Sequence, residues 1–197
     1  MPDKPRIGVF ICHCGKNIAG TVNVPELTEA ARNLPEVQYV GTNLYACSEP
    51  GQKEIQKAVA ENQLNRVVVA ACSPRMHQPT FQACVSAAGL NPSLLEIANI
   101  REGCSWVHLR EPDQATGKAR DLVRMAVAKA GLLEPIVEAR FPVKRAAMVV
   151  GGGIAGIQAS LDMADSGFKV YLVERESCLG GTMAQLNKTY PTMDCAI

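Results

Sequence analysis

The chain has 197 residues, of which 47% are hydrophobic and 20% charged, a composition typical of a soluble globular protein and unlike that of a disordered one. Twenty basic and nineteen acidic side chains leave a formal net charge of +1, so nothing in the overall charge favours binding to nucleic acid or to an anionic membrane surface. No apolar run approaches the roughly 20 residues of a membrane span, and no signal peptide precedes the first strand, so we expect a cytoplasmic protein without a membrane segment.

Short apolar runs alternate with amphipathic segments through the first two-thirds of the chain. This alternation predicts parallel strands joined by right-handed helical crossovers, which is the α/β arrangement of a flavodoxin-like, doubly wound parallel sheet. The expected strands are 7–11, 38–44, 66–71 and 94–100, and the expected helices are 24–33, 50–62, 77–88 and 112–132.

A second domain is expected after a linker. Residues 133–145 contain two prolines and mixed charge, which favours an extended connection. A strand at 147–150, a glycine-rich turn, a helix at 157–166 and a strand at 169–173 follow. The predicted organisation is a cysteine-rich α/β domain at 1–132, a linker at 133–145, and at 146–197 the first βαβ half of a Rossmann domain.

The glycine-rich turn has the pattern G-x-G-x-x-G directly after a strand. Gly151 permits the tight turn, Gly153 allows the backbone to approach a pyrophosphate, and Gly156 allows the helix to pack closely on the strand. Glu174, at the end of the second strand, can accept hydrogen bonds from a ribose. The order of these pieces predicts a dinucleotide site formed by the turn and the residues after the second strand: Gly151, Gly152, Gly153, Ile154, Ala155, Gly156, Glu174, Arg175, Gly181 and Thr182.

The identity of the dinucleotide depends on a second glycine turn. Glu174 is followed by Leu179-Gly180-Gly181-Thr182, and in flavoenzymes of the disulfide-reductase class such a turn commonly encloses the ribose and pyrophosphate of FAD. FAD is therefore favoured, while the motif alone also allows NAD. A purely structural glycine turn is the remaining alternative.

The eight cysteines are more consistent with metal binding or redox chemistry than with disulfides in a cytoplasmic protein. No two of the first six form a C-x-x-C pair, so the spacing itself indicates no ferredoxin or zinc ribbon. Five of them, however, come at the ends of the four expected strands, and the carboxyl ends of parallel strands meet at one edge of a sheet. The candidate metal ligands at this edge are Cys12, Cys14, Cys47, Cys72 and Cys104, with Cys12 and Cys14 competing for one place.

Iron–sulfur and zinc both remain open on this donor set, because four thiolates suit either. The alternative is that the cysteines are small buried hydrophobic residues, which is the interpretation we prefer for Cys84 in the helix at 77–88. No Ser/His/Asp or paired-carboxylate arrangement stands out, so we assign no catalytic residue.

At this point the chain resembles a known family. Three strings, Cys12-His13-Cys14-Gly15, Ala71-Cys72-Ser73-Pro74-Arg75-Met76-His77 and Cys104-Ser105-Trp106-Val107-His108, resemble the N-terminal region of the heterodisulfide reductase A-subunit family. The glycine turn and its continuation Gly180-Gly181-Thr182-Met183 resemble the same region, so the likeness covers essentially the whole chain.

The resemblance implies a cytoplasmic component of an oxidoreductase, with FAD in a thioredoxin-reductase-like domain and a [4Fe–4S] cluster on cysteines of the N-terminal domain. It implies a multisubunit complex whose partners are other heterodisulfide reductase subunits, a hydrogenase or formate dehydrogenase subunit that delivers electrons, and ferredoxin. In methanogenesis, this family is associated with electron bifurcation.

Members of this family are several times longer, and the present sequence reaches only Cys195-Ala196-Ile197. A cysteine three residues after Cys195 would complete a C-x-x-C pair, and some family members use selenocysteine. We therefore hypothesise a reading frame interrupted at a selenocysteine codon, with Cys195 as a further redox or metal ligand; the alternatives are a gene fragment and a separately encoded subunit. On the residues shown, the chain alone is expected to be inactive.

Two other functions remain open. The first is a non-catalytic module that docks partner subunits and whose cysteines are structural or bind zinc. The second is a fragment of an NAD-dependent oxidoreductase.

Overall fold

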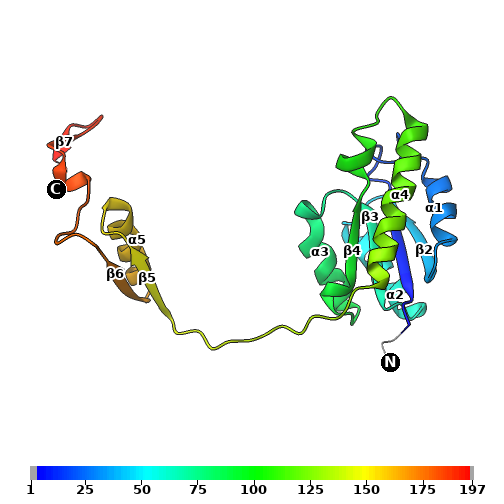
Figure 1. Ribbon diagram of the computed structural model, residues 1–197, viewed down its shortest axis with the longest axis horizontal. Coiled ribbons are helices and arrows are strands. Elements are labelled where there is room, and N and C mark those ends of the chain that lie inside the picture. The colour runs from blue at the N-terminus through cyan, green and yellow to red at the C-terminus, as the bar shows by residue number, and fades with distance from the viewer. Residues whose placement is uncertain (1–3, 196–197) are drawn as a thin grey trace. The chain divides into compact units, whose positions relative to one another are not determined.

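The computed structural model describes residues 4–195, which divide into two compact units meeting at Glu138 and Ala139. The boundary falls within the predicted linker. Each unit is described by itself below (Figure 1).

The first unit is built on a four-stranded parallel sheet with the strand order β2-β1-β3-β4. This order belongs to the flavodoxin-like family of doubly wound sheets, as predicted. Helices α1 and α4 pack together on one face, and α2 and α3 pack together on the other (Figure 1). The strands are β1 (Ile7–Cys12), β2 (Val37–Asn43), β3 (Arg66–Ala71) and β4 (Leu95–Asn99), and the helices are α1 (Val24–Arg32), α2 (Glu49–Glu61), α3 (Pro74–Ala87) and α4 (Pro112–Gly131).

The centre of the sheet forms the core of this unit. Every residue of β1 is buried, and β3 is buried from Val67 onward. Both strands are covered by helices on their two faces, which explains why their sequences are continuous apolar runs instead of alternating ones. Helix α4 buries a stripe of small residues that includes Ala115, Ala119 and Ala130.

Most expected elements of the first unit begin within one residue of the observed start, and α3 differs by three. Helix α3 begins at Pro74 and not at His77, because the Ser73 hydroxyl caps it by accepting a hydrogen bond from the Arg75 N–H at 3.3 Å. Proline is well tolerated at the first helical position, where no N–H is needed. The strand expected from residue 94 begins at Leu95, after a short 3-10 turn at Pro92–Leu94.

After β4 the chain forms a single π-helical turn at Arg101–Ser105, labelled η2. Such turns are rare and are found mostly at functional sites. Here the turn brings Arg101 to the carboxyl edge of the sheet, near Cys14, and turns Cys104 toward α4.

The second unit contains two parallel strands, β5 (Ala146–Val150) and β6 (Lys169–Val173), joined by α5 (Ile154–Asp165). Helix α5 begins three residues earlier than expected, directly after the glycine turn, because Gly153 acts as its N-cap in an extended conformation. The unit closes with a 3-10 turn, η3 (Met183–Gln185), and the two-residue strands β7 (Lys188–Thr189) and β8 (Asp194–Cys195).

Among the residues that the structure describes, no helix combines the length and the hydropathy of a membrane-spanning segment.

Candidate functional site

The glycine turn between β5 and α5 forms the first candidate site. Gly151 has a φ of +106°, which only glycine adopts readily, and its N–H donates to the carbonyl of Val173 at 2.8 Å. A Cβ on Gly156 would overlap the carbonyl oxygen of Gly151, so this position has no room for a side chain. The turn and the start of α5 therefore pack backbone against backbone.

Gly153 has the opposite surroundings. A Cβ built on it would meet no atom within 4 Å, and its backbone has a φ of −75° that any residue can adopt. The space above Gly153 is thus open in the folded unit. No side chain caps the N-terminus of α5, so its first N–H groups face this space and can bind an anion. Ile154 and Ala155, the first two residues of the helix, are exposed beside it.

The second glycine turn lies against the first. The N–H of Gly180 donates to the carbonyl of Gly152 at 2.7 Å, and the two turns form an isolated parallel bridge. A Cβ on Gly181 would lie 3.2 Å from the Cα of Gly153. The pair of turns predicted from the sequence is therefore one structure, with Thr182 exposed at its end.

Glu174 connects the turn to the end of β6. Its Oε2 accepts a hydrogen bond from the Gly152 N–H at 2.6 Å, and its Oε1 accepts from the N–H groups of Arg175 at 2.6 Å and Glu176 at 2.9 Å. These bonds, that of Glu176 first, lower the pKa of Glu174, so the carboxylate is charged at neutral pH. A charged carboxylate here can still accept from a ribose, because its two oxygens offer about four lone-pair sites. Arg175 instead points to solvent and pairs with Glu176.

The residues around the turn fit the pyrophosphate and ribose of a dinucleotide. The fit rests on the open space at Gly153, the uncapped N–H groups of α5 and the carboxylate fixed at the end of β6.

The second candidate site is at the carboxyl edge of the four-stranded sheet. Cys12, Cys14, Cys47 and Cys72 all follow or end strands there, and every cysteine in the chain is free. The pKa of Cys72 is raised to about 11, chiefly by burial; the Arg101 cation opposes this rise, and negative charge on Glu102, Cys47 and Cys14 adds to it. Burial also raises the pKa of Cys12, and negative charge on Cys14 and Cys47 adds to this rise. The four thiols are thus near enough to influence one another electrostatically.

Cys12 accepts hydrogen bonds from two backbone N–H groups. Its Sγ lies 3.3 Å from the N–H nitrogen of Cys14 and 3.4 Å from that of Ala46. Two such donors stabilise a thiolate more than a thiol, and they favour ligation by Cys12 as much as by Cys14.

Arg101 is the residue of this edge that sequence reasoning missed. Its Nη1 donates to Cys14 Sγ at 3.1 Å, and its Nη2 lies 3.2 Å from Met76 Sδ and 3.0 Å from Glu102 Oε1. Although partial burial opposes the charge, the hydrogen bonds to Glu102 and Cys14 raise the pKa of Arg101, so it remains a cation. Cys14 and Met76, in the loop after β1 and in α3, are distant from Arg101 in the sequence, and no sequence pattern links them to it.

Cys104 lies apart from the other candidate ligands. It is fully buried, and its Sγ donates to the carbonyl of Ala115 in α4 at 3.1 Å. Burial raises its pKa. Cys84 is buried in the core, as its position in the helix predicts, and Cys195 is exposed in β8.

The donor chemistry of the edge fits thiolate ligation, but the side-chain positions do not form a closed site. Within residues 4–195, no three Cys, His, Asp or Glu side chains converge closely enough to hold a metal ion. The metal ligands therefore remain a prediction.

The segment that carries both glycine turns, residues 147–193, matches the family described as FAD dependent oxidoreductase. The whole chain is homologous to part of the heterodisulfide reductase A-subunit. It is 58% identical over 99% of its length to the iron-sulfur A-subunit 2 of CoB--CoM heterodisulfide reductase from Methanopyrus kandleri. It is 56% identical over 99% to the A-subunit of H(2):CoB-CoM heterodisulfide,ferredoxin reductase from Methanothermobacter marburgensis. It is 50% identical over 98% to the A-subunit of Ferredoxin/F(420)H(2)-dependent CoB-CoM heterodisulfide reductase from Methanosarcina acetivorans.

These comparisons confirm the resemblance predicted from the cysteine and glycine motifs, and they support FAD as the dinucleotide. The chain spans about 30% of the length of the first two relatives and 24% of the third. The relatives are named as subunits of heterodisulfide reductases, so the homologous region comes from multisubunit complexes.

Proposed function

We propose that this chain is an electron-transfer part of a heterodisulfide-reductase-type complex, with FAD bound at the glycine turns of the second unit and a [4Fe–4S] cluster bound by thiols of the first. The proposed partners are a hydrogenase- or formate-dehydrogenase-type donor, ferredoxin and a disulfide-reducing subunit. Two relatives carry ferredoxin in their names, which supports the choice of ferredoxin.

The observation that carries the proposal is the contrast between Gly153 and Gly156. The glycine at 156 is required by close packing within the fold, whereas the glycine at 153 leaves open a space that the folded unit does not use. A glycine that the fold does not need is explained by a ligand that approaches the backbone there.

FAD supplies the chemistry of the site when bound, because it can exchange one or two electrons with its partners. The residues of this chain bind and orient it. The first N–H groups of α5 neutralise the pyrophosphate, Glu174 accepts from the ribose, and Gly181 with Thr182 closes the second turn beside it.

For the cluster, the supported donor set is Cys12, Cys14, Cys47 and Cys72, whose thiols share one edge of the sheet. Cys104 and Cys195 remain predicted ligands without such support. Arg101 would offset negative charge of the thiolates through its hydrogen bond to Cys14.

The substitution Gly153→Ala tests the flavin site. Its Cβ would project into the open space, so we expect the chain to fold normally and FAD affinity to fall by about tenfold or more, since a methyl group displaces the pyrophosphate from the backbone. FAD binding is measured by quenching of flavin fluorescence, and folding by thermal unfolding.

Two control variants make this result specific. Gly117→Ala adds a methyl group in α4, where nothing lies within 4 Å, and should leave FAD affinity unchanged. Gly156→Ala should reduce stability and FAD binding together. Equal FAD affinity in wild type and Gly153→Ala would contradict the proposed site.

A docking module with structural cysteines is the second candidate function. It is favoured by the absence of three converging metal ligands in the described part of the chain. Anaerobic purification separates the two functions, since about four irons with acid-labile sulfide per chain support the first, and one zinc or no metal supports the second.

A further inference from the structure

The carboxyl edge of the four-stranded sheet exposes an unusual number of large hydrophobic side chains. Eight such side chains are exposed between residues 4 and 132, and six of them lie at this edge, each between 45% and 63% exposed. We call these six the apolar rim: Leu44, Tyr45, Met76, Trp106, Val107 and Leu109. Concentrated exposure of this kind marks an interaction surface, whereas scattered exposed hydrophobic residues do not.

The members of the rim come from the loop after β2, the first turn of α3 and the loop after η2, and contacts connect these segments. The Arg101 guanidinium lies 4.9 Å from the centre of the Trp106 ring and donates to Met76 and Cys14. On the other side, the phenol of Tyr45 lies against Gly15, leaving no room for a side chain there. Through Arg101 and Gly15, these contacts place Met76, Trp106 and Tyr45 next to the loop that carries Cys14.

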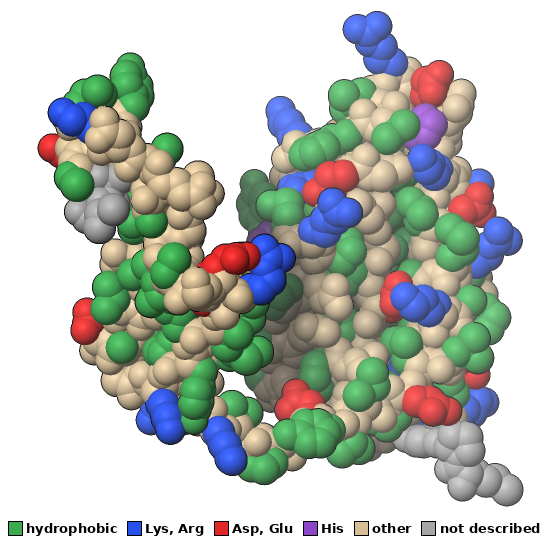
Figure 2. Space-filling model, turned by 60° about the vertical axis from the view of Figure 1, so that its left-hand side comes forward, with side chains coloured by type: hydrophobic (Ala, Val, Ile, Leu, Met, Phe, Trp, Pro, Cys, Tyr) green, Lys and Arg blue, Asp and Glu red, His purple; other side chains and the backbone are tan. Residues whose placement is uncertain are grey.

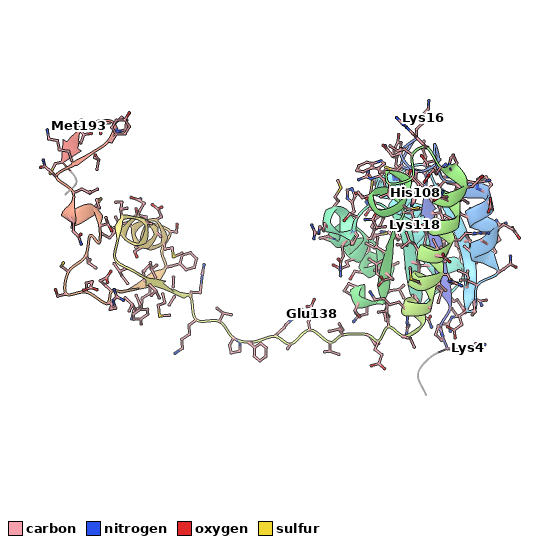
Figure 3. The ribbon with its side chains drawn as sticks, turned by 45° about the horizontal axis from the view of Figure 1, so that its top comes forward. Lys4, Lys16, His108, Lys118, Glu138 and Met193 are labelled. Atoms are coloured by element: carbon pink, nitrogen blue, oxygen red, sulfur yellow. The ribbon has the colours of Figure 1, made fainter. Side chains whose placement is uncertain are left out.

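Among residues 4–195, the unpaired charges around the rim are three cations and one acid, the exposed Asp113 in the first turn of α4. Lys16, Arg75 and Arg110 are exposed, and no ion pair involves them in the described part of the chain. The acidic residues of the last loop are already engaged, Glu102 by Arg101 and Glu111 by His108. Figure 3 shows Lys16 and His108 toward one end of the first unit and Lys4 at the opposite end. Figure 2 shows hydrophobic, basic and some acidic side chains mixed at the upper end of this unit.

An apolar surface bordered by unpaired cations fits a partner with acidic residues around an apolar centre. A second copy of this chain would bring like charges together at the same edge, which disfavours self-association through the rim. We propose that the apolar rim is the docking surface for an acidic redox protein of the ferredoxin type, which would bind directly over the thiol-bearing edge. The inference rests on the proposed function for the class of this partner.

The only tryptophan of the chain reports on docking, because Trp106 lies in the rim. The probe is a purified, strongly acidic 2[4Fe–4S] ferredoxin, titrated anaerobically into the full chain while the fluorescence of Trp106 is followed. We expect saturable quenching whose apparent Kd rises steeply with salt, since the charges at the rim are exposed and therefore screened.

Two variants locate the contact. Replacing three cations together (Lys16→Glu, Arg75→Glu, Arg110→Glu) should raise the Kd at low salt by about tenfold or more, because each exposed charge contributes modestly. Val107→Ser with Leu109→Ser should raise it without changing the salt dependence. Lys4→Glu, a matched charge reversal at the opposite end, should leave the Kd unchanged, and far-UV circular dichroism checks that all variants are folded.

The inference is overturned if the wild-type chain shows no saturable quenching, if the triple variant binds ferredoxin as well as wild type, or if Lys4→Glu weakens binding equally. Flavin and iron contents are measured on the same samples. A chain without FAD or iron would contradict the proposed function. This result does not depend on whether ferredoxin quenches the fluorescence of Trp106, so the two failures can be distinguished.

Discussion

At the scale of single residues, each candidate site contains two residues of the same type in different surroundings. Gly153 and Gly156 belong to one motif, but a Cβ on the first would meet open space, whereas a Cβ on the second would overlap the backbone of Gly151. Cys72 and Cys104 both follow strands, but Cys72 lies within electrostatic range of Cys14 and Cys47, and Cys104 donates to α4. Residue type and spacing therefore identify candidate site residues, but the surroundings of each residue decide which candidates can take part in a site.

The substitution Cys72→Ala tests the thiol edge. We expect it to remove most of the iron from anaerobically purified protein, because the cluster would lose one of four thiolates. Iron and acid-labile sulfide are measured per chain. Cys84→Ala is the matched control and should leave the iron content unchanged. Cys84 is also buried, but it lies in α3, away from the candidate ligands. Full iron content in Cys72→Ala would remove Cys72 from the ligand set.

Glu174 gives a pH-dependent prediction. Three backbone N–H groups lower its pKa in the folded chain, so the stability it contributes is present above the pKa of an unfolded glutamate and is lost as pH falls through the lower, folded value. We expect Glu174→Gln to lower the melting temperature of the second unit at neutral pH and to weaken this acid-dependent loss. Thermal unfolding at neutral and acidic pH checks both. Identical pH profiles for wild type and variant would contradict the role of the carboxylate.

At the scale of elements, the sequence predicted the strands better than the helix starts. Continuous apolar runs locate β3 at Arg66–Ala71 and β6 at Lys169–Val173, as expected. Burial on both faces explains the run in β3, whereas β6 exposes alternate residues. The start of α3 was missed although Ser73-Pro74 is a recognisable cap and first position. The π-helical turn could not be predicted, since no local residue pattern specifies it, and for that reason Arg101 and the direction of Cys104 were missed.

Helix α4 offers a test of the fold that is independent of the sites. Gly117 lies within Pro112–Gly131, and a Cβ there would meet nothing within 4 Å. Glycine inside a helix is less stable than alanine by about 0.5–1 kcal/mol, so Gly117→Ala should stabilise the first unit by about this amount. Urea unfolding followed by circular dichroism measures the change. A destabilised variant would show that the surroundings of Gly117 are wrong.

At the scale of the whole molecule, the chain consists of two units with different degrees of internal burial. The first unit has a core of strands covered on both faces. In the second, one face of the β5–β6 pair exposes Met148, Val150, Tyr171 and Val173. Changes in the sequence pattern predict a domain at 1–132, a linker at 133–145 and a domain at 146–197. The exposure of this face is not predicted, because it depends on what packs against the face and not on local sequence.

Limited proteolysis tests this organisation. The linker has no helix or strand, and its Arg140 and Lys144 are exposed. Trypsin should therefore cut at these positions first and release a fragment of the first unit that keeps the circular dichroism and the unfolding transition of its parallel sheet. Mass spectrometry identifies the cut. Early cleavage within α1 to α4 would contradict the independence of the first unit.

The central claim is that the paired glycine turns bind FAD, and competition between nucleotides tests it most directly. The full chain is titrated with FAD while flavin fluorescence is followed, and NAD⁺ is then added in large excess. We predict one FAD bound per chain that NAD⁺ does not displace, and weaker binding in Gly153→Ala. A chain that binds NAD⁺ in preference to FAD, or that binds neither, would contradict the claim.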